Sequence, residues 1–573
     1  MHQQVLRHVR LLVVPSLLAI GACGGAGDAQ PPSATVTIGG TITFDRIPFK
    51  AGGAGLDPAA VVKAPARQVT VEAIDASNGA TLASTTTDAQ GRYSVDVPAD
   101  RRLFVRAKAQ MVRTGAAPTW RFSVRNNTNA GALYALEGTA FDSGTSGSTH
   151  DLHAASGWGT TGYVDVRSAA PFAILDTVYE AKALLLSTSQ ALDFPALDLY
   201  WSEQNRNVVD EFCPKQGSIG TSFYVGAGAQ DQCAAPDDLP AGIYILGAFD
   251  AMNGDTDEFD PHVLAHEFGH YVEDQFSRAD SGGGEHLTGD RLDLRLAFGE
   301  GWGNAYAAMA LNDPGYRDSF QGFSAEFGFD LEAGDLVTGV NADEAKGWFS
   351  EFSIGRIVWD LFDGDAQHEG SQDDDEVALE FAPLFAVMRG EQRTSDAFAS
   401  IFSFVSAVRA GNPSASGAID NVLAGELIDG RDAFATGESH DGDSPTALPV
   451  YTPIGLNEQT AGVLCTSAKY GDGNKLGYSR FLRLDLDARA NVVITVKGAP
   501  DPSDVTSVKA IDPNIYVHHR GVVVASAESD DLSAETLPQQ ALEAGTYVVE
   551  VLDFALPSGD TTPHCMTVSV SGG

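Results

Sequence analysis

The two ends of the chain alternate apolar and polar residues, whereas the middle repeats apolar residues at helical spacing. A period of two predicts half-buried strands in the N-terminal part, at Thr35–Thr43, Val69–Ile74 and Tyr93–Val97. Thr87–Tyr93 carries the turn residues of a hairpin. The C-terminal part predicts short strands at Arg480–Leu486, Val492–Val496, Ile515–Val517, Val522–Ala525 and Thr546–Leu552. These patterns are typical of β-sandwiches, which we predict at residues 34–125 and 461–573.

The central part combines strands with longer helices. Ala169–Leu186 has the spacing of an amphipathic helix. Strands are predicted at Leu197–Trp201, Ser222–Val225 and Gly242–Gly247, and further helices at Trp348–Phe362, Val377–Met388 and Ala397–Val408. We therefore predict a multidomain protein with an α+β domain at residues 126–433, in which a mixed sheet is followed by a helical second lobe. A segment rich in Gly, Asp, Ser and Pro, residues 434–460, is predicted to link this domain to the C-terminal sandwich.

The first residues resemble a bacterial lipoprotein signal. Arg7 and Arg10 precede an apolar run, and Ile20-Gly21-Ala22-Cys23 follows it. We predict a signal peptide at residues 1–23, a lipid attached to Cys23 and a flexible tether at residues 24–33. An ordinary cleaved signal with an incidental cysteine is the alternative. The prediction places the protein in the bacterial cell envelope or outside the cell, anchored to a membrane by its lipid.

Cysteine count and charge agree with an exported protein. Of five cysteines, Cys23 leaves two plausible disulfides, Cys213 with Cys233 and Cys465 with Cys565, although other pairings stay open. Disulfides are typical of oxidising compartments. The net charge of −41 repels phosphate and so argues against a nucleic-acid partner.

Two acidic segments raise the question of calcium. Asp363-Gly364-Asp365 and Asp373-Asp374-Asp375-Glu376 offer the oxygen ligands that calcium prefers. Their spacing does not match a defined calcium loop, and a solvated acidic loop is the alternative. Calcium therefore enters only as a possible second cofactor.

One five-residue motif carries the chemistry, His266-Glu267-Phe268-Gly269-His270. Residues four apart on a helix lie on one face, so the two imidazoles can bind a single zinc ion, with Glu267 placed as general base. Asp260-Pro261 marks the start of this helix. A catalytic zinc takes three protein ligands, and Glu300 in Gly299-Glu300-Gly301-Trp302 is the best third candidate.

These two motifs together resemble the gluzincin zinc metallopeptidases, most closely the fungalysin branch near thermolysin. The resemblance implies a zincin-type catalytic domain, Glu300 as third zinc ligand and hydrolysis of peptide bonds. The chain departs from the family in three ways. The interval between His270 and Glu300 holds 29 residues, Asn304 replaces the usual aspartate that orients a zinc histidine, and the usual propeptide has no obvious counterpart. The terminal sandwiches resemble a carboxypeptidase regulatory-like module and a pre-peptidase C-terminal domain.

Other residues near these motifs are rival or supporting candidates. Glu273, Asp274 and Glu285 are rival ligands, and His262 is expected to have a structural role at the rim. The strand at Gly242–Gly247 is expected to bind an extended peptide by strand addition. Donors that would stabilise the oxyanion are not distinguished by sequence; the candidates are Tyr306, Tyr316, Arg356 and His368.

Two classes of function follow from these patterns. The first is a secreted, lipid-anchored zinc endopeptidase that acts on a peptide or protein substrate, with Glu267 as general base and accessory β-sandwich domains. The alternative is a surface-binding or adhesive lipoprotein on a zincin scaffold with weak catalysis, for which Asn304 and the missing propeptide are the support. The intact set of His266, Glu267, His270 and Glu300 favours the enzyme.

Overall fold

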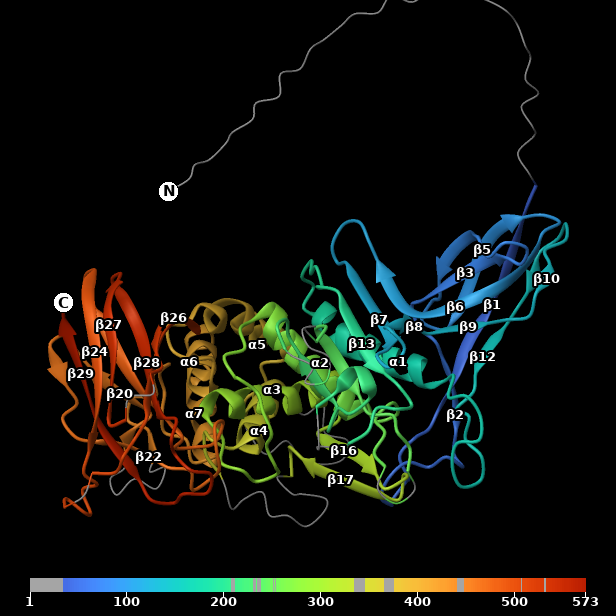
Figure 1. The fold of residues 1–573 in the computed structure, drawn as a ribbon. Helices are drawn as coiled ribbons and strands as arrows, with labels where there is room; N and C mark the ends of the chain where they lie inside the picture. Colours follow the sequence, from blue (N-terminus) through green and yellow to red (C-terminus); the bar gives the residue numbers. More distant parts are fainter. Residues whose placement is uncertain are drawn as a thin grey trace, which may run out of the picture.

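The computed structural model describes residues 34–573 except 208–211, 230–232, 234–238, 251, 253, 334–345, 365–375, 441–447, 507 and 530–531. The predicted signal peptide, the tether and Cys23 lie outside the described residues, as do His368 and most of the two acidic segments. Figure 1 shows a row of three regions, with sheets at the N-terminal end, helices in the middle and a sandwich at the C-terminal end. No helix among the described residues is long and apolar enough to cross a membrane.

The N-terminal region is built from two sheets that share one core. Long β1 pairs in antiparallel fashion with β5 and β2 and in parallel with the short strands β11 and β12. Buried residues of β1, such as Ile38 and Ile42, belong to the same core as Val71 and Val105 of the second sheet. The strands of the first sheet are β1 (Thr35–Arg46), β2 (Val62–Pro65), β5 (Arg92–Pro98), β11 (Ser148–Thr149) and β12 (Leu152–Ala154).

The second sheet extends from the N-terminal region into the centre of the molecule. Its order is β14-β15-β13-β7-β6-β3-β4, with three short strands at its side. The pairing of β13 with β7 and β15 is parallel, and that of β14 with β15 is antiparallel. The sheet is therefore mixed, as predicted. Its strands are β3 (Val69–Asp75), β4 (Thr81–Thr86), β6 (Arg102–Arg113), β7 (Trp120–Asn126), β8 (Ala132–Leu133), β9 (Ala135–Glu137), β10 (Phe141–Asp142), β13 (Leu197–Trp201), β14 (Phe223–Val225) and β15 (Gly242–Ile245).

This topology corrects two predictions. The predicted boundary between residues 125 and 126 falls inside β7, whose partner β13 lies beyond the boundary, so the N-terminal sandwich and the central domain share one sheet. The hairpin predicted at Thr87–Tyr93 is also wrong, because β4 pairs with β3 and β5 pairs with β1. The chain crosses from one sheet to the other at this turn. Local turn residues do not reveal which sheet the next strand joins.

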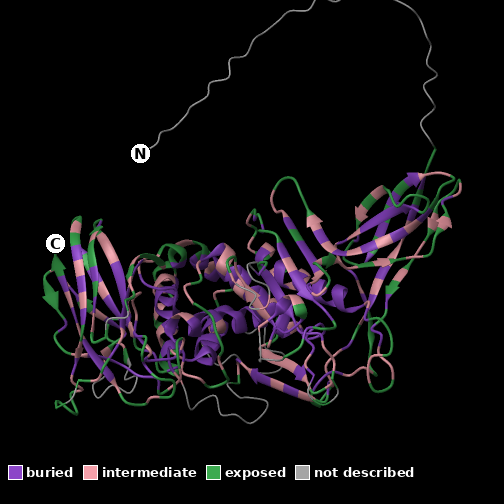
Figure 2. Ribbon diagram, viewed as in Figure 1, coloured by how far each residue is buried: buried purple, intermediate pink, exposed green. Residues whose placement is uncertain are grey.

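Helices form the middle of the molecule, and most of their residues are buried (Figure 2). Helix α1 packs on strands β6 and β7, helices α1, α2 and α3 pack on one another, and α4 packs on α3. A short hairpin, β16 with β17, follows α3. These elements are α1 (Ala170–Ser187), α2 (Pro261–Phe276), α3 (Leu294–Leu311), β16 (Gly315–Phe320), β17 (Ala325–Asp330), α4 (Glu351–Phe362), α5 (Phe381–Val387), the π-helix η3 (Met388–Gln392), α6 (Ile401–Gly411) and α7 (Ser416–Gly425), with a 3₁₀ turn η1 (Pro214–Gln216) before β14.

The C-terminal region is a β-sandwich with a core of its own. One sheet has the order β20-β23-β28-β25-β26, and the other has β21-β29-β24-β27 with β22 beside β29. The first contains β20 (Tyr451–Ile454), β23 (Ser479–Leu486), β25 (Pro513–His519), β26 (Val522–Ala527) and β28 (Gly545–Asp553). The second contains β21 (Glu458–Gln459), β22 (Leu464–Thr466), β24 (Ala490–Ala499), β27 (Ala534–Leu542) and β29 (His564–Gly572).

The segment predicted as a linker, residues 434–460, is largely structured. A small pair, β18 (Ser439–His440) with β19 (Leu448–Pro449), precedes β20. Strand β20 pairs in parallel with β23, and β21 pairs with β29, so both lie inside the sandwich. The sandwich therefore begins before residue 461.

The sandwich contacts the helical region through an ion pair, a backbone hydrogen bond and aromatic packing. The Arg295 guanidinium donates to both carboxylate oxygens of Glu550, each at 2.9 Å. The backbone of Leu476 donates to the Arg291 carbonyl oxygen at 2.8 Å. Phe398 packs edge-on against Phe481 with ring centroids 5.3 Å apart. The start of α3 is therefore held by the C-terminal sandwich as well as by the other helices.

Candidate metal centre

The first ligand helix, α2, begins at Pro261 as predicted, but Asp260 does not cap it. Pro261 occupies the first turn, where its missing N–H leaves no intrahelical bond unmade. The Asp260 carboxylate instead accepts hydrogen bonds from the backbone N–H and the hydroxyl of Ser319 on β16. The helix is buried on nearly all sides, with Phe268 and Val272 completely enclosed. Its position is therefore set by packing against α1, α3 and the sheet.

The helix that carries Glu300 is α3, Leu294–Leu311. It begins at Leu294, where the Asp293 carboxylate accepts from the Arg295 backbone N–H at 2.9 Å. Glu300 therefore lies inside the helix and not at its N-terminus. Gly269 and Gly303 allow the two helices to approach closely, because an added methyl on Gly269 would lie 3.1 Å from the Gly303 Cα.

His266, His270 and Glu300 converge on one point. The two Nε2 atoms are 3.0 Å apart, and the Glu300 Oε2 lies 3.2 Å from His266 Nε2 and 3.5 Å from His270 Nε2. Ligands about 2.0 to 2.1 Å from a tetrahedral zinc are separated by roughly 3.3 to 3.4 Å. The donor set and its spacing therefore fit zinc.

Asn304 lies where the resemblance places it, one helical turn after Glu300. Its Oδ1 is 2.9 Å from His266 Nδ1, so it accepts the hydrogen bond that leaves Nε2 free to bind a metal. The amide of Asn304 also lies 3.5 Å from the Glu351 carboxylate. An uncharged acceptor thus orients the imidazole in place of the usual aspartate.

Glu267 is buried next to the cluster and hydrogen-bonded to the sheet. Its Oε2 accepts from the backbone N–H of Tyr224 on β14 at 2.6 Å. Burial raises the pKa of the Glu267 carboxyl to about 7, and the charge of Glu300 adds to this, while His266 opposes it. A carboxyl with a pKa near neutrality is suited to accept and return a proton at physiological pH.

His286 is a functional candidate that sequence reasoning missed. It lies in the long interval between α2 and α3, with Nε2 3.4 Å from Glu300 Oε2 and 3.9 Å from Glu351 Oε2. Burial alone would lower its pKa, but the two carboxylates outweigh it and raise the pKa to about 10. Burial likewise disfavours the charge of Glu300, but the imidazoles of His270, His266 and His286 hold its pKa well below the ordinary value. The sequence feature that could have pointed to His286 is the unusual length of the interval between His270 and Glu300.

The structure separates the candidate oxyanion donors. Tyr306 is buried and donates to the Ala181 carbonyl oxygen at 2.7 Å, and Arg356 is paired with Glu426 at 2.7 Å. Both are thereby used in the core. The Tyr316 ring, from β16, lies edge-on to the His266 ring with centroids 6.2 Å apart. Among the described candidates, Tyr316 is the one that lies beside the metal ligands.

The rival ligands lie elsewhere. Asp274 accepts from the Tyr224 hydroxyl at 2.6 Å, and Glu285 is exposed. Glu273 is buried, with a pKa raised well above its ordinary value by burial and by the charge of Asp280. His262 is buried, with Nε2 3.3 Å from the Asp313 carbonyl oxygen. None of the four belongs to a described metal-binding group with His266 and His270.

The strand next to the site is β14, which corrects the strand chosen for peptide binding. The predicted strand, β15, has partners on both sides, β13 and β14. Strand β14 is the edge of the sheet, and the Tyr224 N–H that reaches Glu267 belongs to it. Of the described strands next to the site, β14 is therefore the one at which strand addition is possible.

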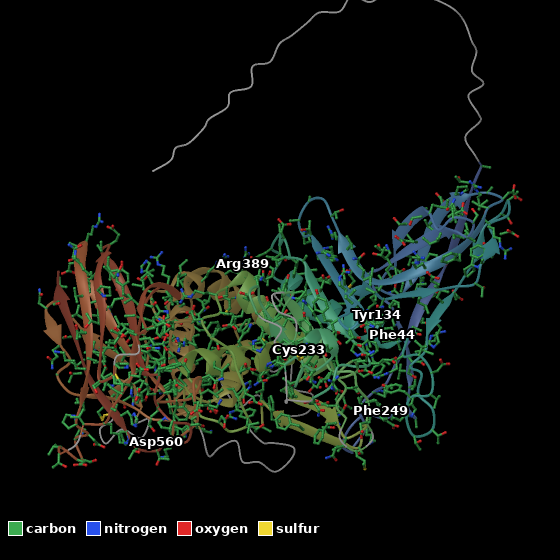
Figure 3. The ribbon with its side chains drawn as sticks, in the orientation of Figure 1. Phe44, Tyr134, Cys233, Phe249, Arg389 and Asp560 are labelled. Carbon is green, nitrogen blue, oxygen red and sulfur yellow. A yellow bond between two sulfur atoms is a disulfide. The ribbon has the colours of Figure 1, made fainter. Side chains whose placement is uncertain are left out.

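Both predicted disulfides are present, Cys213–Cys233 and Cys465–Cys565. Cys233 lies in the central region near the edge of the mixed sheet (Figure 3). Cys465 and Cys565 are directly opposite each other on β22 and β29. The first disulfide links the segment before β14 to the segment after it, and the second links two strands of the C-terminal sandwich.

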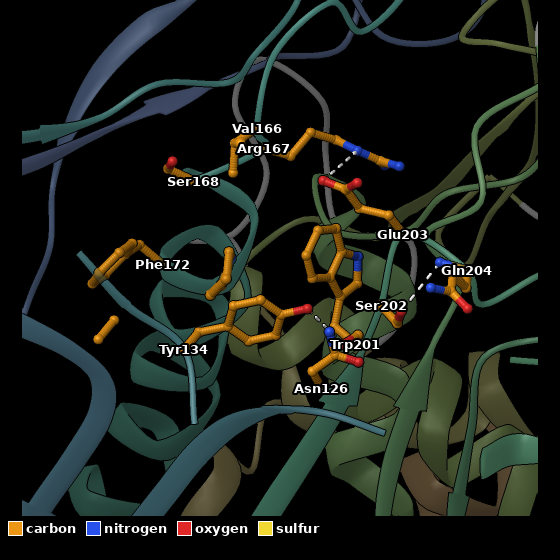
Figure 4. Close-up of a pocket in the computed structure, with 12 residues that line it drawn as sticks. Asn126, Tyr134, Val166, Arg167, Ser168, Phe172, Trp201, Ser202, Glu203 and Gln204 are labelled. Carbon is orange, nitrogen blue, oxygen red and sulfur yellow. Dashed lines mark hydrogen bonds and ion pairs between the residues drawn. The ribbon is translucent and has the colours of Figure 1, made fainter. Parts of the chain in front are cut away.

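A cavity of about 390 Å³ lies apart from the metal centre, where α1 begins and β13 ends. Tyr134, Trp201 and Phe172 line it with Arg167 and Glu203, and Figure 4 shows Arg167 directed toward Glu203. Arg167 is only 5% exposed and also donates to Glu258 at 2.9 Å. The charged groups of this cavity are thus already paired, and its lining contains neither the cluster histidines nor Glu267.

Comparisons with known proteins do not assign this chain to a family. No protein-family model and no curated protein matches the chain. Among solved structures, the pre-peptidase C-terminal domain of a collagenase from Bacillus anthracis is 15% identical and covers 21% of this chain and 93% of its own, with a TM-score of 0.15. A 9R-lipoxygenase from Cyanothece is 10% identical, covers 29% of this chain and 26% of its own, and has a TM-score of 0.13. Likenesses at these scores carry no argument, so the sandwich rests on its own strand pairing.

Proposed function

We propose that this protein is a zinc-dependent endopeptidase, anchored by a lipid on Cys23 in the cell envelope or outside the cell. The observation that carries the proposal is the convergence of His266, His270 and Glu300, with Glu267 buried beside them. Two imidazoles and one carboxylate with an open side are the donor set of a catalytic zinc site. A structural zinc site would instead be closed by four protein ligands.

Each residue of the proposed centre has a separate task. His266, His270 and Glu300 would hold the zinc, and Asn304 would keep His266 in the correct tautomer through its Nδ1. When bound, zinc supplies a Lewis acid that polarises the scissile carbonyl and makes water more acidic. His286, whose Nε2 lies 3.4 Å from Glu300 Oε2, would help to hold the Glu300 carboxylate in place.

Glu267 would move the proton. Its carboxylate would accept a proton from the attacking water and then return it to the leaving amine. The Tyr224 N–H, at 2.6 Å, fixes one carboxylate oxygen, which leaves the other for this transfer. Tyr316 is the proposed donor to the oxyanion, since it lies beside His266 and its hydroxyl has no hydrogen-bond partner among the described residues, unlike Tyr306 and Arg356.

The proposed substrate is an extended peptide segment. Strand β14 has an unpaired edge next to Glu267, so main-chain hydrogen bonds along it would place a scissile bond near the metal. Main-chain recognition of this kind favours unfolded protein over folded protein. Side-chain preference would be set by the surface around β14 and by the loop that carries His286.

The test compares hydrolysis of unfolded casein by the chain from residue 24 with that by Glu267→Gln. Exposed Glu285→Gln is a matched control, because it makes the same chemical change on the neighbouring loop. We expect the wild type and the control to cleave, and Glu267→Gln to lose at least about 100-fold in rate. Zinc content is measured in all three proteins, and one zinc per chain is expected in each.

The possible results separate the hypotheses. Equal background cleavage by all three proteins with zinc bound would favour the scaffold alternative over the enzyme. Absence of zinc from the wild type after zinc loading would refute the metal assignment itself. Cleavage that Glu267→Gln retains would remove Glu267 from the mechanism.

A further inference from the structure

Four aspartates surround the start of α2, away from the zinc ligands. Asp255 and Asp257 lie in the loop after β15, Asp260 directly precedes α2, and Asp318 lies on β16. Asp255, Asp257 and Asp318 each offer a carboxylate oxygen within 4.8 Å of the others. Two segments of the chain, the loop after β15 and strand β16, thus bring their acids to one point.

The carboxylates of this cluster are buried without donors for all their oxygens. Asp257 is only 2% exposed, and its Oδ1 has no hydrogen-bond partner, whereas its other oxygen accepts from the Ser222 hydroxyl. The Oδ1 atoms of Asp255 and Asp318 are also buried without a partner. Asp260 is different, since Ser319 satisfies its carboxylate. Most buried polar atoms in proteins are paired, so three orphaned oxygens in one cluster indicate a missing partner.

The protein supplies no cation for this charge within its described residues. Arg317, the neighbour of Asp318, makes a bidentate pair with Glu326 at 2.7 Å. Arg167, which approaches the same loop, is paired with Glu258. No Lys, Arg or His of the described chain forms an ion pair with Asp255, Asp257 or Asp318.

Burial of several like charges is unfavourable, and the pKa values of the carboxyl groups are raised as a result. Burial raises the pKa of Asp255 to about 6. It also raises the pKa of Asp257 and Asp318 well above the ordinary value, and the charges of the neighbouring aspartates add to the effect. The cluster must therefore be neutralised by bound protons or by a bound cation.

We propose that Asp255, Asp257 and Asp318 bind one calcium ion. The donors are all hard carboxylate oxygens, which suits calcium and does not suit zinc, whose sites are rich in histidine and cysteine. Calcium is favoured over magnesium because it accepts several protein oxygens in flexible geometry, whereas magnesium retains most of its water. The site differs from the acidic segments at 363–365 and 373–376, and it does not depend on the proposed peptidase activity.

Calcium at this point would fasten the β16–β17 hairpin to the start of the first ligand helix. Asp255 already forms an isolated bridge with Phe320 at the end of β16, and Asp260 is bonded to Ser319 on the same strand. Tyr316, which lies beside His266, belongs to this strand. Loss of the ion would therefore loosen the hairpin and the wall of the metal centre that Tyr316 forms.

The test measures calcium binding and thermal unfolding of the zinc-loaded chain from residue 24, at neutral pH. Calcium chloride is titrated by calorimetry, and the melting temperature is compared in excess calcium, in excess magnesium and in a calcium-selective chelator. Two variants are compared with the wild type. Asp257→Asn/Asp318→Asn removes two charges of the proposed site, and Asp373→Asn/Asp375→Asn removes two charges from the acidic segment.

We expect the wild type and Asp373→Asn/Asp375→Asn to bind calcium and to melt at higher temperature when it is present, with a smaller effect of magnesium. Asp257→Asn/Asp318→Asn should lose about 100-fold or more in calcium affinity, because affinity depends on the number of charged ligands. In chelator the melting temperature of Asp257→Asn/Asp318→Asn should no longer fall below that of the wild type, since two repelling charges are gone.

Three results would overturn the proposal. No calcium-dependent shift in the wild type would mean that protons alone neutralise the cluster. A shift that survives in Asp257→Asn/Asp318→Asn, or one that Asp373→Asn/Asp375→Asn loses, would place the calcium elsewhere. If the double variant fails to fold even in chelator, the single variant Asp255→Asn takes its place, and undiminished calcium affinity in that variant would also refute the site.

Discussion

Replacement of Gly303 by alanine should weaken zinc binding while the fold survives. Gly303 lies on α3 opposite His266, and the two helices approach closely at this point. A methyl group built on Gly303 would lie 2.8 Å from His266 Cε1, 2.9 Å from Nδ1 and 3.0 Å from Nε2. The nearest obstacle is thus the end of a side chain rather than backbone, so the imidazole has to move.

The size of the effect follows from these distances. Carbon atoms in contact are about 3.5 to 4.0 Å apart, so the His266 ring must retreat by roughly 0.5 to 1 Å. Zinc–nitrogen bonds tolerate about 0.2 Å. Retreat also disturbs the hydrogen bond from Nδ1 to Asn304. Changes in such supporting contacts typically lower metal affinity about 10- to 100-fold, which corresponds to about 1.4 to 2.8 kcal/mol.

The fold itself should change much less in stability. Crowding in a packed core costs about 1 to 3 kcal/mol. Alanine in a helix gains about 1 kcal/mol over glycine, which offsets part of that cost. The metal-free protein should therefore remain folded, and the loss should appear in its zinc affinity.

Zinc affinity is measured by competition with a chromophoric chelator, and folding by circular dichroism without metal. Gly417→Ala is the matched control, because Gly417 lies in helix α7 and an added methyl there meets nothing within 4 Å. The control should bind zinc as the wild type does. Unchanged zinc affinity in folded Gly303→Ala would refute the reasoning, since it would show that His266 is not a ligand or that the helices separate without cost.

Three further predictions concern stability. Glu550→Gln should destabilise the folded protein by about 2 to 4 kcal/mol in urea unfolding, because it leaves the buried Arg295 with fewer partners. Arg295 and His518 hold the pKa of Glu550 well below its ordinary value despite burial. The stability that Glu550 contributes should therefore be present above the pKa of the unfolded chain and be lost as the pH falls toward the lower pKa of the folded protein. An equal acid-induced loss of stability in Glu550→Gln would contradict this prediction. The double change Cys465→Ser and Cys565→Ser opens a link of sequence separation 100 and should cost up to about 4.7 kcal/mol in urea unfolding, and reduction of the wild type, which opens both disulfides, should cost at least as much. Lys182→Met should stabilise the protein most at low pH. Burial lowers the pKa of Lys182 to about 7, so between this pH and the ordinary lysine pKa the unfolded chain binds one proton more than the folded protein. The stability difference between Lys182→Met and the wild type should therefore shrink by about 2 to 3 kcal/mol from pH 6 to pH 9. A constant difference between wild type and Lys182→Met across this range would show that Lys182 is charged in the folded state.

The elements with a strong local pattern could be predicted closely. Strand β13 has the bounds predicted for it, Leu197–Trp201, and α1 is displaced by a single residue at each end. Both have apolar residues at a clear period, so burial of one face decides their structure. Strand β27 was not predicted, because Glu535, Gln539 and Gln540 interrupt its apolar alternation, and β29 was not predicted although Met566, Val568 and Val570 alternate with polar residues.

The candidate site could be predicted where its residues are close in sequence. His266, Glu267 and His270 share one helix, and helical geometry alone places them together. Asn304 follows Glu300 by one turn, so its place was also predictable once α3 was expected. His286 and Tyr224 come from a loop and an edge strand, and no local spacing relates either to the ligand helix.

Local periodicity therefore determines which segments are helices and strands, and it places the histidines of α2 on one face. Cysteine count and spacing proposed the two disulfide pairs that the structure contains. Tertiary packing decides the rest. It joins β7 to β13 across a predicted domain boundary, makes β14 the free edge, and gathers Asp255, Asp257 and Asp318 from distant segments. Sheet order and buried charge depend on contacts between residues far apart in the chain, and no short-range pattern encodes them.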